Sequence, residues 1–324
     1  MVTSLIGLMV ALSVVILALG FYVLIKSANY LIEGASALAH TLKVPDIAIG
    51  LTIVAFGTSA PELIVNVVSS VNGHHEMCFG NVLGSNIFNT LVVLGFAAIM
   101  APLEIKRNTV RKEIPFILIG CLAVFGMANN FGFAGHVLSR VEGLFLVAAL
   151  FGFLVYVVLM SKETAFVEVD IHEMKSTKAV WLIILGCLGL FLGGNMVVYN
   201  AINIGRMLHV SEKFIGLTVV ALGTSLPELV TSVVAVTKKR GDLAVGNVIG
   251  SNLFNILMVL GLTSVINPIN YDVMLNYDFI FLILITLIMY ITFLTGKKKH
   301  LNRLEGISFL ILYGIYITFL INRG

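Results

Sequence analysis

Long runs of apolar residues make up most of the chain, and short clusters of charged and turn-forming residues separate them. A helix needs roughly 20 apolar residues to cross a bilayer, and most of these runs reach that length. The pattern divides the chain into ten segments, each of which we expect to be a membrane-spanning helix. The segments cover residues 4–40, 45–70, 81–101, 114–128, 141–160, 179–208, 212–237, 243–266, 277–295 and 304–321.

The two halves of the chain are copies of one another. A shift of 166 residues places Gly50–Gly95 on Gly216–Gly261 without a gap, and 25 of these 46 residues are identical. The same shift pairs Asn29 with Asn195 and Pro102 with Pro268. Each copy holds five predicted spans, an odd number, so the second copy must enter the membrane from the opposite side. The sequence therefore predicts two inverted five-helix repeats, as in many secondary transporters.

The distribution of Lys and Arg predicts the orientation, because cytoplasmic loops carry an excess of both. Of the 20 such residues, fifteen fall in one set of loops and four in the other, while Lys26 lies within the first span. The poorly charged set consists of Arg140, Arg206, Lys213 and Arg323. We therefore expect both termini to lie outside the cell. Residues 1–160 form the first repeat, 161–178 a cytoplasmic linker, and 179–324 the second repeat of one membrane domain.

Composition narrows the function classes. Apolar residues are 59% of the chain and charged residues 11%, compared with about 25% charge in a typical soluble domain. A soluble enzyme is therefore excluded. The net charge of +3 does not point to nucleic acid, and no nucleotide-binding loop is present. Three cysteines without paired spacing predict neither a disulfide framework nor a zinc site.

Chemistry concentrates in a motif that occurs once in each copy, GTSAPE in the first and GTSLPE in the second. It places Glu62 and Glu228 at equivalent positions in the middle of a predicted span. A charged side chain at the bilayer centre costs about 2.5–3.5 kcal/mol, so such residues face a cavity or a partner. A two-fold axis in the membrane plane would bring the two carboxylates together at the midplane.

The proline of each motif predicts an opened helix. Pro61 and Pro227 have no N–H, so the carbonyl four residues earlier loses its helical partner. Carbonyls near Thr58 and Thr224 can then turn toward a cation, which is tolerable at membrane depth where the backbone lines a cavity. Further polar oxygens come from Ser59, Ser225, Ser85, Ser251, Asn89 and Asn255.

This inventory of ligands favours a hard cation, because it contains oxygen and no thiolate or imidazole. Two carboxylates and two threonine carbonyls offer about six oxygens, within the range that Ca²⁺ takes. The two glutamates, Glu62 and Glu228, also match the charge of one divalent ion. When Ca²⁺ leaves, other cations or protons must replace it, because the two carboxylates would repel each other. That requirement is typical of an exchanger.

The paired motifs, each followed by G-N-V-[LI]-G-S-N-[IL]-F-N, resemble the alpha-repeats of the cation/Ca²⁺ exchanger superfamily, and most closely its Na⁺/Ca²⁺ exchanger branch. The resemblance implies ten helices in two inverted halves, with four short helices around a central site. It implies that the first and sixth helices slide across the remaining core to alternate access.

The resemblance also implies a division of ligands. Glu62, Glu228 and the carbonyls of Thr58 and Thr224 would bind Ca²⁺. Na⁺ would use the two glutamates together with Ser59, Ser85, Ser225, Ser251 and the carbonyls of Ala55 and Ala221. Some family members have Asp where this chain has Asn255, and both Asn89 and Asn255 are neutral here, as site-lining residues or Na⁺ ligands. That difference disfavours a potassium-dependent exchanger.

We therefore expect a secondary active antiporter that exchanges Na⁺ for Ca²⁺ across the plasma membrane, and that is neither an enzyme nor dependent on a cofactor. Its partners would be Ca²⁺, Na⁺ and the lipid bilayer, with no nucleic acid or nucleotide, and it would function as a monomer. A Ca²⁺/H⁺ exchanger, or a K⁺-dependent one, of the same fold is the alternative. A channel would need a continuous pore, and an intramembrane hydrolase would need a catalytic partner that the motifs lack.

Overall fold

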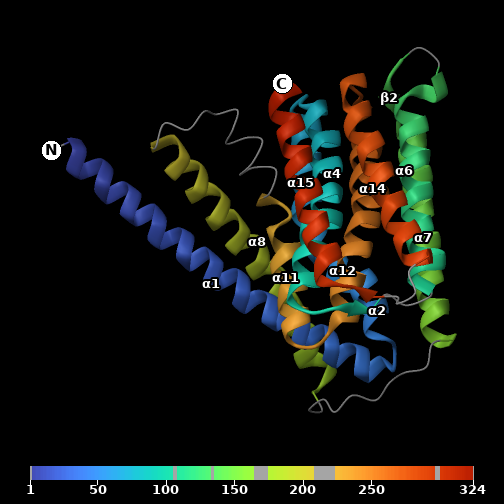
Figure 1. The fold of residues 1–324 in the computed structure, drawn as a ribbon, viewed down its shortest axis with the longest axis horizontal. Coiled ribbons are helices and arrows are strands. Elements are labelled where there is room, and N and C mark those ends of the chain that lie inside the picture. Colours follow the sequence, from blue (N-terminus) through green and yellow to red (C-terminus); the bar gives the residue numbers. More distant parts are fainter. Residues whose placement is uncertain are drawn as a thin grey trace.

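A computed structural model describes residues 2–104, 108–132, 135–163, 174–207, 223–295 and 300–323. The chain forms a bundle of long helices (Figure 1). The α-helices are α1 (Val2–Leu42), α2 (Asp46–Ile49), α3 (Ala55–Val71), α4 (His75–Phe88), α5 (Leu94–Met100), α6 (Ile114–Ala128), α7 (Arg140–Glu163), α8 (Ser176–Met207), α11 (Leu226–Thr237), α12 (Gly241–Phe254), α13 (Leu260–Ile266), α14 (Asn276–Thr295) and α15 (Arg303–Arg323).

Wider or tighter helical turns join several of these elements. The π-helical turns are η1 (Gly50–Val54), η2 (Asn89–Val93), η3 (Thr109–Glu113) and η6 (Asn255–Val259), and the 3₁₀ turns are η4 (Asn130–Gly132) and η7 (Val273–Leu275). Because η2 and η6 start at equivalent asparagines, both copies widen at the same point of the helix. Such π-helical turns occur frequently at functional sites.

The helices agree closely with the predicted spans. Within the described residues, eight continuous helical segments are long and apolar enough to cross a membrane. They are Met9–Leu42, Asp46–Val71, His75–Met100, Arg140–Ser161, Ser176–Met207, Gly241–Ile266, Val273–Leu294 and Arg303–Arg323. The fourth predicted span corresponds to the shorter helix α6. Of the seventh, residues 212–222 lie outside the described residues, and the described part contains α11. The chain is thus a multi-pass membrane protein, while the full number of ten spans stays a prediction.

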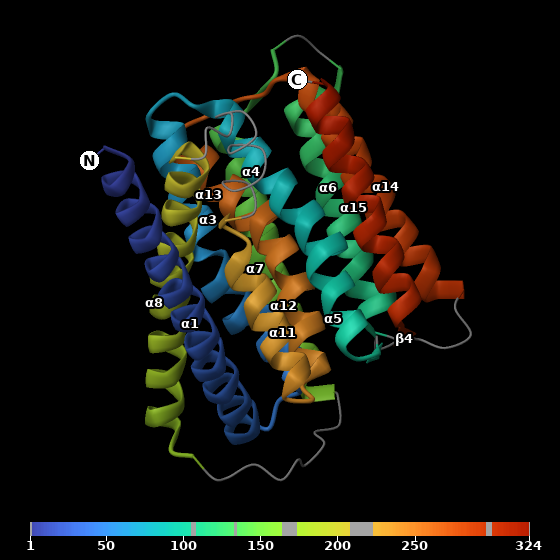
Figure 2. The same ribbon diagram turned by 60° about the vertical axis from the view of Figure 1, so that its left-hand side comes forward.

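Two short strand pairs link the two halves at opposite ends of the bundle (Figures 1 and 2). β1 (Leu103–Glu104) pairs antiparallel with β4 (His300–Leu301), and β2 (Val137–Leu138) pairs antiparallel with β3 (Ile269–Asn270). Each pair joins a strand of the first half to one of the second. Both chain termini lie toward the end that carries β2 and β3.

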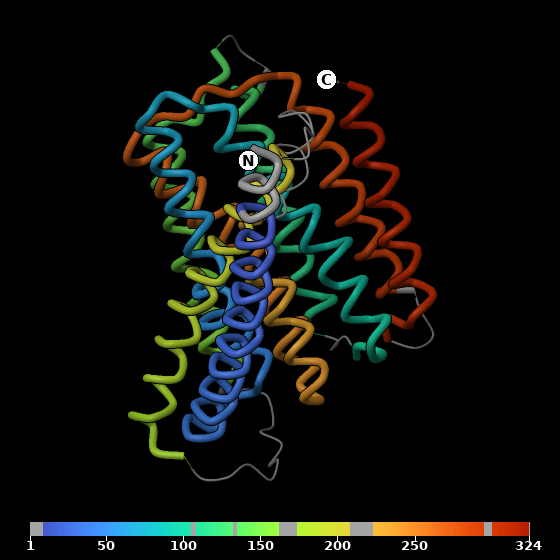
Figure 3. Tube along the Cα trace, turned by 90° about the vertical axis from the view of Figure 1, so that its left-hand side faces the viewer, coloured from blue at the N-terminus to red at the C-terminus, as the bar shows by residue number. Residues whose placement is uncertain are grey.

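Helices α1 and α8 run antiparallel beside each other along one side of the bundle (Figure 3). Glycines on α8 make this approach close. A Cβ added to Gly186 would lie 2.7 Å from the backbone nitrogen of Leu31, and one added to Gly193 would lie 2.9 Å from that of Leu24. Small residues let membrane helices pack backbone to backbone, so α1 and α8 form a tight pair.

The centre of the bundle is built from the segments that carry the repeated motifs. Every residue of α12 from Leu243 to Phe254 is buried. In the most apolar 18-residue stretch of His75–Met100 and of Gly241–Ile266, 83% of the residues are buried. The corresponding share is 17% for Met9–Leu42 and for Arg303–Arg323. The polar residues of both motifs therefore lie in the best-covered part of the protein, surrounded by helices that face lipid.

Candidate functional site

Glu62 and Glu228 lie close to each other at the centre of the bundle, as their equivalent positions predict. Glu62 is on α3, and Glu228 is in the first turn of α11. Both side chains are 0% exposed, and their carboxylates are near enough to interact electrostatically. Ser59 Oγ, from the first motif, donates a hydrogen bond of 3.4 Å to Glu228 Oε1, in the second. The two repeats thus share one polar centre.

Reciprocal hydrogen bonds join each motif to the other repeat. Thr58 Oγ1 donates to Asn247 Oδ1 at 3.1 Å, and the equivalent Thr224 Oγ1 donates to Asn81 Oδ1 at 3.2 Å. Sequence reasoning assigned no role to Asn81 or Asn247. The available signal was that the asparagine is identical in both copies of G-N-V-[LI]-G-S-N. The contact itself crosses between repeats, so no spacing along the chain reveals it.

A second pair of hydrogen bonds orients these asparagines. Asn81 Nδ2 donates to Asn66 Oδ1 at 2.7 Å, and Asn247 Nδ2 donates to Ser232 Oγ at 2.9 Å. With each amide nitrogen occupied in this way, each amide oxygen is directed at the threonine. In each repeat, a polar side chain (Asn66 or Ser232) thus orients the asparagine, and the asparagine in turn holds the threonine whose carbonyl is a predicted ligand.

The remaining predicted residues that the structure describes are also buried, and two of them make contacts that cross between the repeats. Ser251 Oγ lies 3.2 Å from Thr58 Oγ1, and Asn255 Nδ2 donates to Asn86 Oδ1 at 3.1 Å. The side chains of Ser85, Asn89, Ser225, Ser251 and Asn255 are all at most 1% exposed. Ala55 begins α3 and is buried. Its predicted counterpart Ala221 lies outside the described residues.

The two prolines have different effects on the backbone, which corrects the prediction of two opened helices. α3 continues through Pro61, whereas in the second copy the chain turns at Thr224 and Ser225 and α11 begins at Leu226. Proline removes only one helical hydrogen bond, and a packed helix can pass through it. The opened backbone is confirmed beside Pro227, whereas at Pro61 the helix stays continuous and only the carbonyl of Gly57 loses its helical partner.

Many buried polar atoms at this centre have no hydrogen-bond partner in the described part of the chain. They are both carboxylate oxygens of Glu62, Oε2 of Glu228, the hydroxyls of Ser85 and Ser225, both amide atoms of Asn89 and Oδ1 of Asn255. Buried polar groups in native proteins are nearly always paired, so this set requires an explanation. Most of the unpaired atoms are oxygens, with two carboxylates among them. A cluster of this kind fits a hard cation as its missing partner.

One side of this centre is open and the other is closed. Thr58 and Asn247 are 0% exposed, whereas their counterparts Thr224 and Asn81 are half-buried and line a cavity of about 370 Å³. The cavity extends between α4, α14 and α15 to Arg323, near the end of the chain. The cavity thus ends at Thr224 and Asn81, on the side of the polar centre that faces the termini, and neither Glu62 nor Glu228 lines it.

Known proteins resemble this chain along nearly its whole length. The family model described as "Sodium/calcium exchanger protein" matches residues 12–159 and 178–322. Sodium/calcium exchanger MaX1 of Methanosarcina acetivorans is 30% identical, with 97% of this chain and 99% of that protein covered. Inner membrane protein YrbG of Escherichia coli is 34% identical, with 84% of this chain and 88% of that protein covered.

The fold has a close counterpart among solved structures. The sodium-calcium exchanger NCX_Mj, soaked with Na⁺ and Sr²⁺, superimposes with a TM-score of 0.81 at 31% identity, covering 95% of this chain and 99% of that one. Sequence, fold and the cation-suited centre agree that this chain is a member of the sodium/calcium exchanger protein family, whose members exchange cations against Ca²⁺.

Proposed function

We propose that the protein is a secondary active antiporter that exchanges Na⁺ for Ca²⁺ across the plasma membrane. The observation that carries this proposal is the cluster of unpartnered, fully buried oxygens around Glu62 and Glu228. Two carboxylates in a low-dielectric interior need cations with a total charge of about +2 beside them. One Ca²⁺ supplies that charge, and so do two Na⁺, which gives the two ions a common site.

In this proposal the glutamates bind both ions and the neutral oxygens distinguish between them. Glu62, Glu228 and the carbonyls of Thr58 and Thr224 hold Ca²⁺. Na⁺ uses the same glutamates together with Ser59, Ser225, Ser85, Ser251 and the carbonyls of Ala55 and Ala221, and Asn89 and Asn255 line the site. These neutral oxygens can hold one Na⁺ more than the two that balance the carboxylates. Exchange would then move net charge.

Alternating access would follow from the inverted repeats. The cavity beside Thr224 and Asn81 supports a path from the terminal side, and exchanging the roles of the two repeats would open a path beside Thr58 and Asn247. The tightly packed pair α1 and α8 would slide as one body against the core. Residues 1–160 and 179–324 act as the two repeats of one domain, with ten spans, a cytoplasmic linker 161–178 and both termini outside.

Transport by the purified protein in K⁺-free liposomes tests the proposal. Gradients of Na⁺, K⁺ or protons are imposed one at a time, and ⁴⁵Ca²⁺ uptake is followed with the voltage clamped by an ionophore or left free. We expect uptake with the Na⁺ gradient alone and a dependence of its rate on voltage. Uptake that requires K⁺, or that runs equally well on a proton gradient without Na⁺, would contradict Na⁺ coupling.

A further inference from the structure

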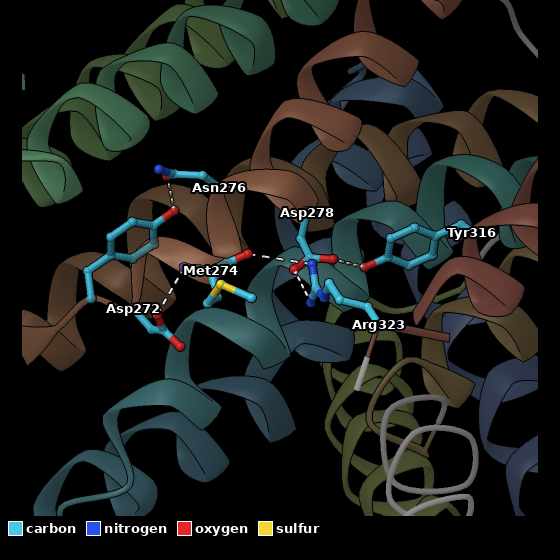
Figure 4. Close-up of polar contacts among 7 residues, drawn as sticks. Asp272, Met274, Asn276, Asp278, Tyr316 and Arg323 are labelled. Carbon is cyan, nitrogen blue, oxygen red and sulfur yellow. Dashed lines mark hydrogen bonds and ion pairs between the residues drawn. The ribbon is translucent and has the colours of Figure 1, made fainter. Parts of the chain in front are cut away.

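A third buried carboxylate, Asp278, lines the cavity that leads to the polar centre. It lies in the first turn of α14 and is 3% exposed. Tyr316 donates its hydroxyl to Asp278 Oδ1 at 2.9 Å, and Arg323 Nη2 lies 2.8 Å from Asp278 Oδ2 (Figure 4). Both partners come from α15. The pair therefore ties the end of α15 to the start of α14 in the wall of the cavity.

Arg323 is fixed in this position by several contacts. Its Nη1 donates to the carbonyl oxygen of Met274 at 3.5 Å, and its guanidinium lies over the rings of Tyr277 and Phe319, 6.0 and 5.5 Å from their centroids. The Asp278 side chain is 5% exposed and that of Arg323 22%. The ion pair is thus largely withdrawn from solvent, where each charge acts over a longer range than at the surface.

Two charged residues belong to the described lining of this cavity. Among the described residues that line it, Asp278 and Arg323 are the charged ones, and Thr224 and Asn81 lie at its inner end. As a pair they contribute no net charge to a path that a cation would follow. Either residue alone would give the path a net charge, and low-dielectric walls would focus the field of that charge along the cleft.

The internal duplication supplies a comparison at the other end of the bundle. A shift of 165 residues places Glu113-Ile-Pro-Phe116 on Asp278-Phe-Ile-Phe281. Tyr156 of α7 hydrogen-bonds to Glu113, as Tyr316 of α15 does to Asp278. Both carboxylates thus join equivalent helices. Asp278 differs because it pairs with arginine and lines the cavity, whereas Glu113 is not among the described residues that line it.

We propose that the Asp278–Arg323 pair sets the charge of the access path on the terminal side, and thereby the rate at which divalent cations reach the site. This inference rests on the proposed function for its ion, Ca²⁺. Loss of Arg323 leaves a carboxylate that attracts Ca²⁺ into the path. Loss of Asp278 leaves a guanidinium that repels it. The two changes therefore act in opposite directions, which a purely structural clamp between α14 and α15 would not produce.

Transport measured with Ca²⁺ added on the terminal side tests whether the two changes have opposite effects. For Arg323→Gln we expect the Ca²⁺ concentration at half-maximal uptake to fall about tenfold, and for Asp278→Asn to rise about tenfold, with both shifts shrinking at high ionic strength. The double variant and the charge-preserving Arg323→Lys should stay near the unsubstituted protein. Glu113→Gln, the matched control, should leave this concentration unchanged. Shifts of both single variants in the same direction would overturn the proposal.

A chemical measurement tests the path without any transport. Leu320 lines the same cavity one helical turn before Arg323. Leu320→Cys, in a background lacking Cys78, Cys121 and Cys187, is reacted with a cationic and an anionic methanethiosulfonate. We expect Arg323→Gln to raise the cation-to-anion rate ratio and Asp278→Asn to lower it. An unchanged ratio would refute the proposal even if exchange is intact. Changed ratios without Na⁺-driven Ca²⁺ uptake would instead refute the proposed function.

Discussion

The two copies of the repeated motif have nearly the same sequence and very different surroundings. Thr58 and Asn247 are sealed in the core, while Thr224 and Asn81, which make the equivalent hydrogen bond, border a cavity. The first motif lies on a continuous helix, whereas the second contains a turn at Thr224 and Ser225. Since the residues are the same, the difference must come from how the surrounding helices pack. An inverted duplication can therefore present one closed and one open face.

The largest effect is expected from the two glutamates, because the comparison of the two motifs assumes that both serve one site. Glu62→Gln and Glu228→Gln should each abolish or severely reduce Ca²⁺ transport, because an amide cannot neutralise a divalent ion. Loss of one partner of a buried charge pair costs about 3–5 kcal/mol, or roughly 10²–10⁴ in affinity. ⁴⁵Ca²⁺ uptake at equal expression measures this, with thermal unfolding as the control for folding. Near-normal uptake by either variant would remove that residue from the site.

A smaller effect is expected where the motif glycines face α8. A Cβ at Gly57 would lie 2.3 Å from Cys187 Sγ, and one at Gly223 would lie 2.2 Å from Val198 Cγ2. Gly57→Ala should therefore slow exchange several-fold, because overpacking costs about 1–3 kcal/mol. The double variant Gly57→Ala/Cys187→Ala removes the clashing sulfur and should recover most of the rate. No recovery would show that the glycine is needed for another reason than its contact with α8.

The stabilities of variants at Asn247 and Asn81 should differ, because one asparagine lies in the closed core and the other borders the cavity. Asn247→Ala removes the hydrogen bonds that join Asn247 to Thr58 and to Ser232 in a sealed core, which costs about 1–3 kcal/mol. Asn81→Ala makes the equivalent change beside a cavity, where water can replace the amide, so we expect a smaller loss. Thermal unfolding of the two purified variants gives the comparison. Equal losses of stability would contradict the difference in accessibility.

The smallest effects should come from the serines. Ser85 Oγ has no partner in the described structure, whereas Ser251 Oγ lies beside Thr58 Oγ1. Ser85→Ala and Ser251→Ala should each weaken the Na⁺ dependence of exchange about two- to tenfold, the effect of one lost hydrogen bond or ligand, and change Ca²⁺ dependence less. Initial rates at varied Na⁺ and Ca²⁺ separate the two. Equal losses for both ions would contradict the proposed division of ligands.

The sequence predicted the features that depend on order along the chain. Spacing of apolar runs located the helices, and the duplication placed Glu62 and Glu228 together. It could not predict contacts that cross between helices, such as those of Asn81 and Asn247, because spacing along one helix carries no information about another. Asp278 went unnoticed for the same reason, since its partners Tyr316 and Arg323 lie on α15. The different behaviour of Pro61 and Pro227 depends on the surroundings of two motifs that differ at one residue.

The central claim is that two repeats supply one glutamate each to a single cation site. Equilibrium binding of ⁴⁵Ca²⁺ to the purified protein in detergent, with Na⁺ as competitor, tests it most directly. We expect one Ca²⁺ per chain, displaced by Na⁺, and loss of that binding in Glu62→Gln and in Glu228→Gln alike. Two bound Ca²⁺ ions per chain, of which each variant loses one, would show two independent sites and contradict the claim.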